Sequence, residues 1–221
     1  MIAFTNEITN AETNQTHVSF PLDLSVSFPI EQHTVRSLLN LIYMVYTREA
    51  QLSKATQGKF HIDKYLIDTL AEDENFETKE ELIDFIKAQI EDSRRCEGIS
   101  FDTDKVVIDG FKDVPSPELA ETYRRLALQM NKTAISSKKI QAKEITEANE
   151  KYSFRIWLVR LGMSGADFKN DRKELMKRLS GHSAFRTETD RQKWIERYKN
   201  KSGAVDAVVE TFHPSESDEQ K

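Results

Sequence analysis

The alternation of apolar and polar residues marks out the strands of this chain. Apolar residues recur at every second position over 17–29, which predicts a strand with one buried face. Pro21 lies inside this run and has no N–H to donate, so we expect an edge strand or a strand with a break. A second run of period two, over 99–111, is divided by the polar residues 102–105 and predicts a β-hairpin. Together these three strands would form a small antiparallel sheet.

Between and after the strands, the apolar residues recur at helical spacing. A first helix is predicted from a capping Thr34 to about residue 55, and a shorter one over 60–71. Thr78 and Glu81 form a capping-box pattern that predicts the start of a third helix.

The sharpest boundary in the chain is Val114-Pro115-Ser116-Pro117. Ser116 is a good N-cap, and Pro117 would occupy the first helical position, where a missing N–H costs nothing. No Gly or Pro follows until Gly162, and residues 140–150 are rich in good helix formers. The pattern predicts a long helix that reaches about residue 150, with a bend near the paired serines 136 and 137.

These elements predict an α+β fold that is predominantly helical. It would combine the small antiparallel sheet of three strands with a long helix and a C-terminal helical bundle. We expect four segments along the chain, which are a flexible N-terminal arm over 1–16, an α+β part over 17–113, a helical part over 114–202 and a tail over 203–221 that is disordered at its end.

Charge is distributed unevenly along the chain of 221 residues, which has a net charge of −5. Residues 151–201 hold 14 Lys and Arg against 6 Asp and Glu, so this segment carries +8 and the rest carries −13. The basic segment either meets an anionic partner or packs beside the acidic part. A single cysteine, the absence of a secretory-signal pattern at the start and the lack of a long apolar run predict a cytoplasmic protein without a membrane partner.

The stretch 150–186 places several arginines at positions that periodicity assigns to the interior. Residues 152–163 form a predicted helix with apolar side chains on every side, which is typical of a buried helix. Arg155 and Arg160 lie within it, with Trp157 between them. A buried guanidinium needs a carboxylate or a ligand, so these arginines are either internal braces or ligand contacts.

Another helix is predicted after Gly162, because Ser164 and Asp167 form a capping pattern. Arg172 falls in the apolar stripe of this helix, and arginine is the residue of choice for planar recognition of a carboxylate or a phosphate. A separate row of lysines on the same helix predicts a solvated basic face. Its members are Lys169, Lys173 and Lys177.

Gly181 ends that helix, and a short connection follows before the last predicted helix. The connection holds His182, Ser183, Phe185 and Arg186, which offer hydrogen-bond donors, an aromatic face and a cation. Such a loop fits an anion or nucleotide site, and it also fits a tight turn in which Phe185 plugs the core. The candidate ligand-binding residues of the whole stretch are Arg155, Trp157, Arg160, Arg172, Gly181, His182, Ser183, Phe185 and Arg186.

Three stretches carry a resemblance to a known family. They are KYSFRIWLVRLGMSGADFK at 151–169, NLIY with LSKATQG near 40–58, and ALQMNKTAI with IQAKEITEANEKY at 127–152. In these stretches the chain resembles a family of phage- and prophage-encoded proteins of Gram-positive bacteria, commonly labelled virulence-related protein, over most of 35–190. The resemblance implies a setting, the cytoplasm of a bacterium that carries a phage, and it implies no catalytic residues.

Four classes of function are compatible with these patterns. The favoured one is a non-enzymatic phage accessory protein that binds an anionic ligand, such as a nucleotide signal of host antiviral defence. The alternatives are a nucleic-acid-binding phage protein, although no RRM, KH or zinc-finger pattern is present, and a protein–protein inhibitor or homo-oligomer that pairs through the long helix. An enzyme is least favoured because the common catalytic motifs are absent and the five His are scattered, so we predict no catalytic residue, no metal site and no cofactor.

Overall fold

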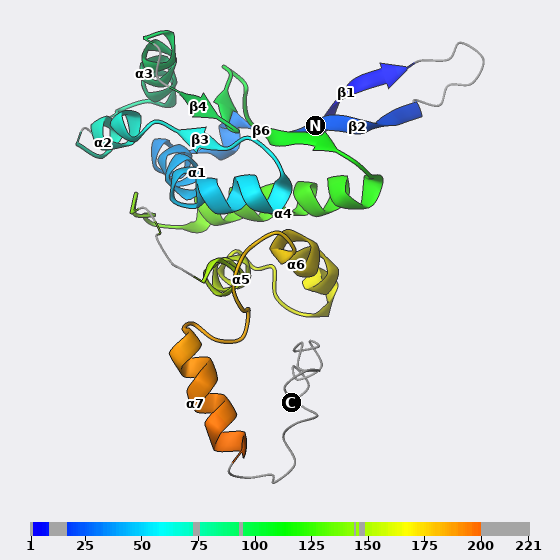
Figure 1. Ribbon diagram of the computed structural model, residues 1–221. Helices are drawn as coiled ribbons and strands as arrows, with labels where there is room; N and C mark the ends of the chain where they lie inside the picture. The colour runs from blue at the N-terminus through cyan, green and yellow to red at the C-terminus, as the bar shows by residue number, and fades with distance from the viewer. Residues whose placement is uncertain are drawn as a thin grey trace.

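Within the described residues, a four-stranded antiparallel sheet is covered on one face by two long helices (Figure 1). The computed structural model describes residues 2–8, 17–72, 76–92, 95–143, 145 and 149–199. The strand order is β1-β2-β6-β5, with β1 at Ile2–Ile8, β2 at His17–Pro29, β5 at Ser100–Phe101 and β6 at Lys105–Val114. The covering helices are α1 (Val35–Thr56) and α4 (Pro117–Ser136).

Strand β2 follows its sequence pattern closely. Its even-numbered residues from Leu22 to Phe28 are buried beneath the helices, and Asp23, Ser25 and Ser27 alternate with them at half-buried positions. The strand lies between β1 and β6, so it is not an edge strand. Of the two possibilities that Pro21 suggested, an edge strand or a strand with a break, the structure has the break. The pairing register between β1 and β2 shifts in the stretch of β2 that contains Pro21. β1 itself arises within the segment 1–16 that we predicted to be an arm.

A smaller unit lies at the far end of α1. A two-stranded sheet of β3 (His61–Ile62) and β4 (Cys96–Glu97) connects to helices α2 (Lys64–Glu72) and α3 (Lys79–Glu91). Thr78 caps α3 as predicted, since its hydroxyl accepts the N–H of Glu81 at 3.1 Å. Phe60 packs edge-on against Phe111 of β6, so the small unit joins the main core.

The core is densest where α1 and α4 cross the sheet. Phe111 and Tyr123 are nearly parallel rings with centroids 5.2 Å apart, and both are buried. The Tyr123 hydroxyl donates to the Thr56 carbonyl at the end of α1 at 3.1 Å. Ser116 caps α4 and Pro117 is its first residue, as predicted.

Helix α4 ends at Ser136, so our prediction of a helix reaching residue 150 is wrong over 137–143. Asn40, a fully buried residue of α1, bonds the backbone at this end. Its Nδ2 donates to the carbonyls of Ala134 at 3.1 Å and Ser137 at 2.8 Å, and its Oδ1 accepts the N–H of Ile140 at 2.8 Å. A side chain from another helix therefore satisfies three backbone groups at and after the end of α4.

The C-terminal part packs two helices beneath α1 and α4 and projects a third (Figure 1). The packed helices are α5 (Glu150–Arg160) and α6 (Lys169–Met176), with a short 3₁₀ turn, η2 (Ala166–Phe168), before α6. α7 (Glu188–Lys199) extends away from this pair. The prediction that residues 152–163 are buried on every side is wrong, because Phe154 and Leu158 are buried while Val159 is 41% exposed.

The α+β fold class with a predominance of helix is confirmed. The three predicted strands are present, and β1 adds a fourth to their sheet. The predicted cap of α1 is also observed, and α7 has a cap of the same kind. The capping residues are Thr34, which accepts the N–H of Ser37, and Thr187, which accepts the N–H of Asp190.

His33 is buried between the 3₁₀ turn η1 (Ile30–Gln32) and α1. Its Nδ1 lies 3.2 Å from the Ser37 hydroxyl. Burial lowers the pKa of His33 below its ordinary value of 6.5, the nearby Asn131 amide opposes this, and the charge of Lys79 lowers the pKa further. The folded chain therefore favours the neutral imidazole more than the unfolded chain does.

We expect the stability of the protein to depend on pH through His33. As pH falls through 6.5, the unfolded chain takes up a proton before the folded chain does, so stability that is present above this pH is lost below it. In urea unfolding, the wild type should lose more free energy of unfolding between about pH 7.5 and pH 5.5 than the His33→Gln variant does. Equal losses in the two proteins would contradict this assignment.

Candidate functional site

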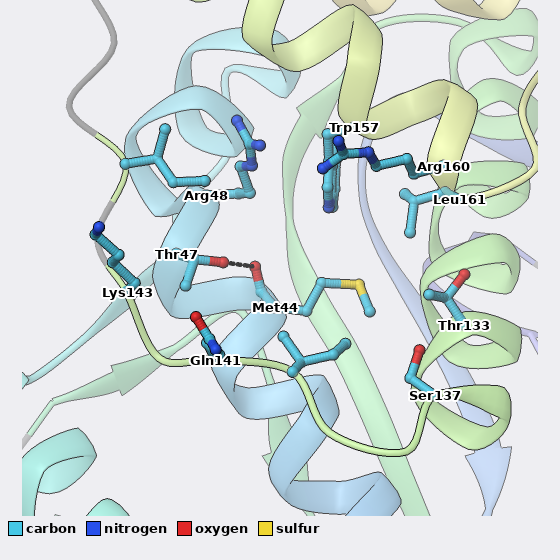
Figure 2. A pocket seen from close by; sticks show the side chains of 12 residues that line it. Met44, Thr47, Arg48, Thr133, Ser137, Gln141, Lys143, Trp157, Arg160 and Leu161 are labelled. Carbon is cyan, nitrogen blue, oxygen red and sulfur yellow. Dashed lines mark hydrogen bonds between the residues drawn. The ribbon is translucent and has the colours of Figure 1, made fainter.

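A pocket of about 710 Å³ opens where α1, the end of α4, residues 137–143 and 145, and the end of α5 meet (Figure 2). Its volume lies within the range of small-molecule sites, roughly 300–1,000 Å³. The residues that line it are Met44, Thr47, Arg48, Thr133, Ser137, Ile140, Gln141, Lys143, Ile145, Trp157, Arg160 and Leu161.

Arg48 enters the pocket from the middle of α1, although it is only 8% exposed. One guanidinium nitrogen donates to Gln51 Oε1 at 2.6 Å and to Ser153 Oγ at 3.4 Å. The guanidinium carbon lies 5.7 Å from the centre of the Trp157 ring. A cation over an indole face is attracted by the ring quadrupole, so Trp157 holds Arg48 in place rather than offering that face to a ligand.

Two further cations stand at the mouth of the pocket. Arg160 is the last residue of α5, and Lys143 lies on the segment that follows α4. Both side chains are exposed, and neither makes an ion pair or hydrogen bond with another residue of the described chain. Figure 2 shows them on opposite sides of the view, with Arg48 and Trp157 between them.

The remaining lining combines neutral polar groups with an apolar surface. The side chains of Thr133, Ser137 and Gln141 make no hydrogen bond within the described residues, so they can bond a ligand or water. The Thr47 hydroxyl donates to the Met44 carbonyl at 3.2 Å. Among the described residues of the lining there is no Asp or Glu. The site is therefore positive, with hydrogen-bonding capacity beside an apolar surface.

Arg172 does not reach the pocket. It is 5% exposed on α6, in the apolar stripe where periodicity placed it. One guanidinium nitrogen donates to the carbonyls of Met163 and Gly165, each at 3.0 Å. The predicted cap from Ser164 is wrong, because η2 begins after Gly165 without a side-chain cap. Arg172 thus braces the connection between α5 and α6, which corrects our prediction of a ligand contact.

Removal of the Arg172 guanidinium should lower the stability of the protein. Arg172→Met keeps the aliphatic stem and leaves two carbonyls without their donor, so we expect the free energy of unfolding to fall by about 2–3 kcal/mol. Lys173→Met, on the exposed side of the same helix, should change it by less than about 0.5 kcal/mol. Urea unfolding of both variants makes the comparison, and equal effects would show that Arg172 is not a brace.

The loop 181–186 is organised by Asn149, which caps α5. Asn149 Oδ1 accepts the N–H groups of Tyr152 and His182, and its Nδ2 donates to the Phe185 carbonyl. Gly181 has φ of +94°, and a Cβ there would lie 2.3 Å from Asn149 Oδ1. Through Asn149, this loop connects the start of α5 to the start of α7, and none of its residues lines the pocket.

Side chains of the loop face α7 rather than a ligand. The Phe185 ring lies 5.7 Å from Trp194, and His182 Nε2 lies 3.5 Å from a Glu188 oxygen. Ser183 is half-buried. The alternative reading of this loop as a helix–helix turn therefore describes it better than a binding loop, although Phe185 packs on α7 and not in the main core.

Gly181 has both a positive φ and a close contact with Asn149, and substitutions can separate the costs of these two features. Gly181→Ala would combine positive-φ strain with a collision at Asn149, whereas Gly165→Ala carries positive φ with no atom within 4 Å. We expect Gly181→Ala to lower the free energy of unfolding by more than Gly165→Ala, which should cost on the order of 1 kcal/mol. Urea unfolding followed by Trp fluorescence tests this, and equal costs would contradict the contact with Asn149.

Of the nine candidate ligand-binding residues, the structure brings Trp157 and Arg160 to the pocket. Arg155 and Arg186 lie elsewhere, and each interacts within the protein. The sequence reasoning missed Arg48 and Lys143. A signal existed for Arg48, which interrupts the apolar stripe of α1 between buried positions 45 and 52. No sequence signal pointed to Lys143, because its position depends on where α4 ends.

Comparisons with known proteins add no assignment to this geometry. Neither models of protein families nor curated protein sequences nor solved structures gave a match. Among the described helices, none is both long and apolar enough to cross a membrane. Within the same residues, no three His, Cys, Asp or Glu side chains are grouped so as to hold a metal ion.

Proposed function

We propose that this protein is a non-enzymatic binding protein that takes a small anionic molecule into the pocket between α1, α4 and α5. The observation that carries the proposal is the charge of the lining. Lys143 and Arg160 share one space with the Gln51-bonded guanidinium of Arg48, and the described lining contains no Asp or Glu. Arginine and lysine side chains form strong charge-assisted hydrogen bonds with phosphate and carboxylate groups.

A nucleotide is the class of ligand that best matches the whole lining. Its phosphate suits the cations at the mouth, its base and sugar carry groups for Thr133, Ser137 and Gln141, and its ring faces suit the apolar surface of Met44 and Leu161. A pocket of about 710 Å³ has room for a molecule of this size.

The resemblance to phage and prophage proteins of Gram-positive bacteria supports a biological setting for such binding. In a bacterium under phage attack, a protein that captures a nucleotide signal of antiviral defence would protect the phage. Binding rather than catalysis is the proposed activity, since the described lining holds no His, Cys, Asp or Glu for general acid–base chemistry.

Thermal unfolding in the presence of nucleotides tests the proposal. The set would contain mononucleotides, cyclic mono- and dinucleotides and pyrophosphate, with adenosine as an uncharged match for the base. We expect at least one nucleotide at about 100 times its dissociation constant to raise Tm by about 5–10 °C, and adenosine to have little effect. A folded protein that no member of the set stabilises would refute nucleotide binding.

Variants locate the binding. Arg160→Gln and Lys143→Gln each remove one charge from the mouth, and each should weaken binding of the stabilising nucleotide by on the order of tenfold, measured by calorimetry. Lys173→Gln removes an exposed lysine of α6 that lies outside the pocket and serves as the matched control. An equal loss in all three variants would point to diffuse charge attraction instead of this site.

A further inference from the structure

The segment after α4 adopts a conformation that its own sequence disfavours. Residues 137–143 read Ser-Lys-Lys-Ile-Gln-Ala-Lys and contain no Gly or Pro, and lysine, glutamine and alanine are good helix formers. The paired serines 136 and 137 can bend a helix, but no Gly or Pro ends it at Ser136, and the seven residues that follow are not helical. Conflicts between local preference and tertiary structure are expected at functional positions.

Asn40 occupies the backbone groups that a longer helix would need. In an α-helix each N–H bonds the carbonyl four residues earlier, so a continued α4 would use the carbonyls of Ala134 and Ser137 and the N–H of Ile140. These are the three groups that the Asn40 amide bonds, at 3.1, 2.8 and 2.8 Å. The N–H of Ile140 has one hydrogen, so it cannot bond Asn40 as observed and also the carbonyl of Ser136 as a longer helix requires.

The observed non-helical form of 137–143 builds one side of the pocket. Ile140, Gln141 and Lys143 line it from this segment, opposite Trp157 and Arg160 of α5. In a continued helix these residues would follow the axis of α4 and leave the pocket without that wall. The position of Lys143, one of the three cations, thus depends on a residue roughly a hundred positions earlier in the chain.

We propose that Asn40 is the positioning residue of the pocket, and that it holds 137–143 as the outer wall against a helix that would extend α4 and dismantle the site. That this wall matters for a ligand rests on the proposed function. The competition between the observed form of 137–143 and a longer α4 is independent of the proposed function, and it can be measured without any ligand.

The test compares backbone ¹³Cα chemical shifts of residues 137–143 in the full-length wild type and in Asn40→Ala. We expect these shifts to change from the non-helical values of the wild type to the helical range in the variant, because the three bonded groups return to the backbone. Asn131→Ala is the matched control, since Asn131 is also a buried asparagine, 3% exposed, and it does not contact this segment through any hydrogen bond of the described chain. The control should keep the non-helical shifts of the wild type.

A second substitution blocks the competing helix. Ser137 has φ of −80° and ψ of 135°, the conformation that a following proline favours, so Lys138→Pro is compatible with the observed backbone of Ser137 and opposes the longer helix. In the double variant Asn40→Ala/Lys138→Pro, we expect the shifts of 139–143 to return to the non-helical values of the wild type. A merely structural role for Asn40 would not be rescued in this way.

Each outcome decides the matter. Asn40→Ala that folds with the non-helical shifts of the wild type overturns the proposal, because no helix was held back. If the single variant does not fold, folding of the double variant supports the proposal, and failure of both overturns it, since Asn40 would then support the whole fold. Failure of all nucleotides to bind a wild type that passes this test would remove the proposed function and leave the role of Asn40 intact.

Discussion

The buried amide of Asn40 is the contact on which the C-terminal half of the structure depends. Its donors and acceptor replace the hydrogen bonds that would otherwise extend α4, and so determine where that helix ends. The direction of the chain over 137–143 follows from that end. An amide can do this because it both donates and accepts, whereas an apolar side chain would leave the last carbonyls unsatisfied in the interior.

A second polar junction, at the start of α5, completes the frame of the pocket. Glu150 accepts from Lys54 of α1 and from the N–H and hydroxyl of Ser180, while Gln51 donates to the Glu150 carbonyl. Burial raises the pKa of Glu150, and the bonds from Lys54 and Ser180 outweigh this and keep the pKa below its ordinary value. The pocket lies between these two junctions, and both attach its walls to α1.

Arg48 and Arg172 show why similar sequence patterns lead to different roles. Both are buried arginines in the apolar stripe of a helix, at 8% and 5% exposure. Arg172 faces the backbone of a turn and bonds the carbonyls of Met163 and Gly165. Arg48 lies against an indole and opens on a cavity. Periodicity identifies the buried face of a helix, but the groups that meet it come from distant parts of the chain.

Local sequence by itself determined the strand periodicity of β2 and β6, the caps at Thr34, Thr78, Ser116 and Thr187, and the predominantly helical α+β class. Each of these depends on neighbours within a few residues. Only the tertiary structure decided that α4 ends at Ser136, that α5 is buried on one side, and that Arg48 and Lys143 join Trp157 and Arg160. The physical reason is that hydrogen bonds between distant residues, such as those of Asn40, outweigh helix preferences that amount to a fraction of a kcal/mol per residue, roughly 0–0.7.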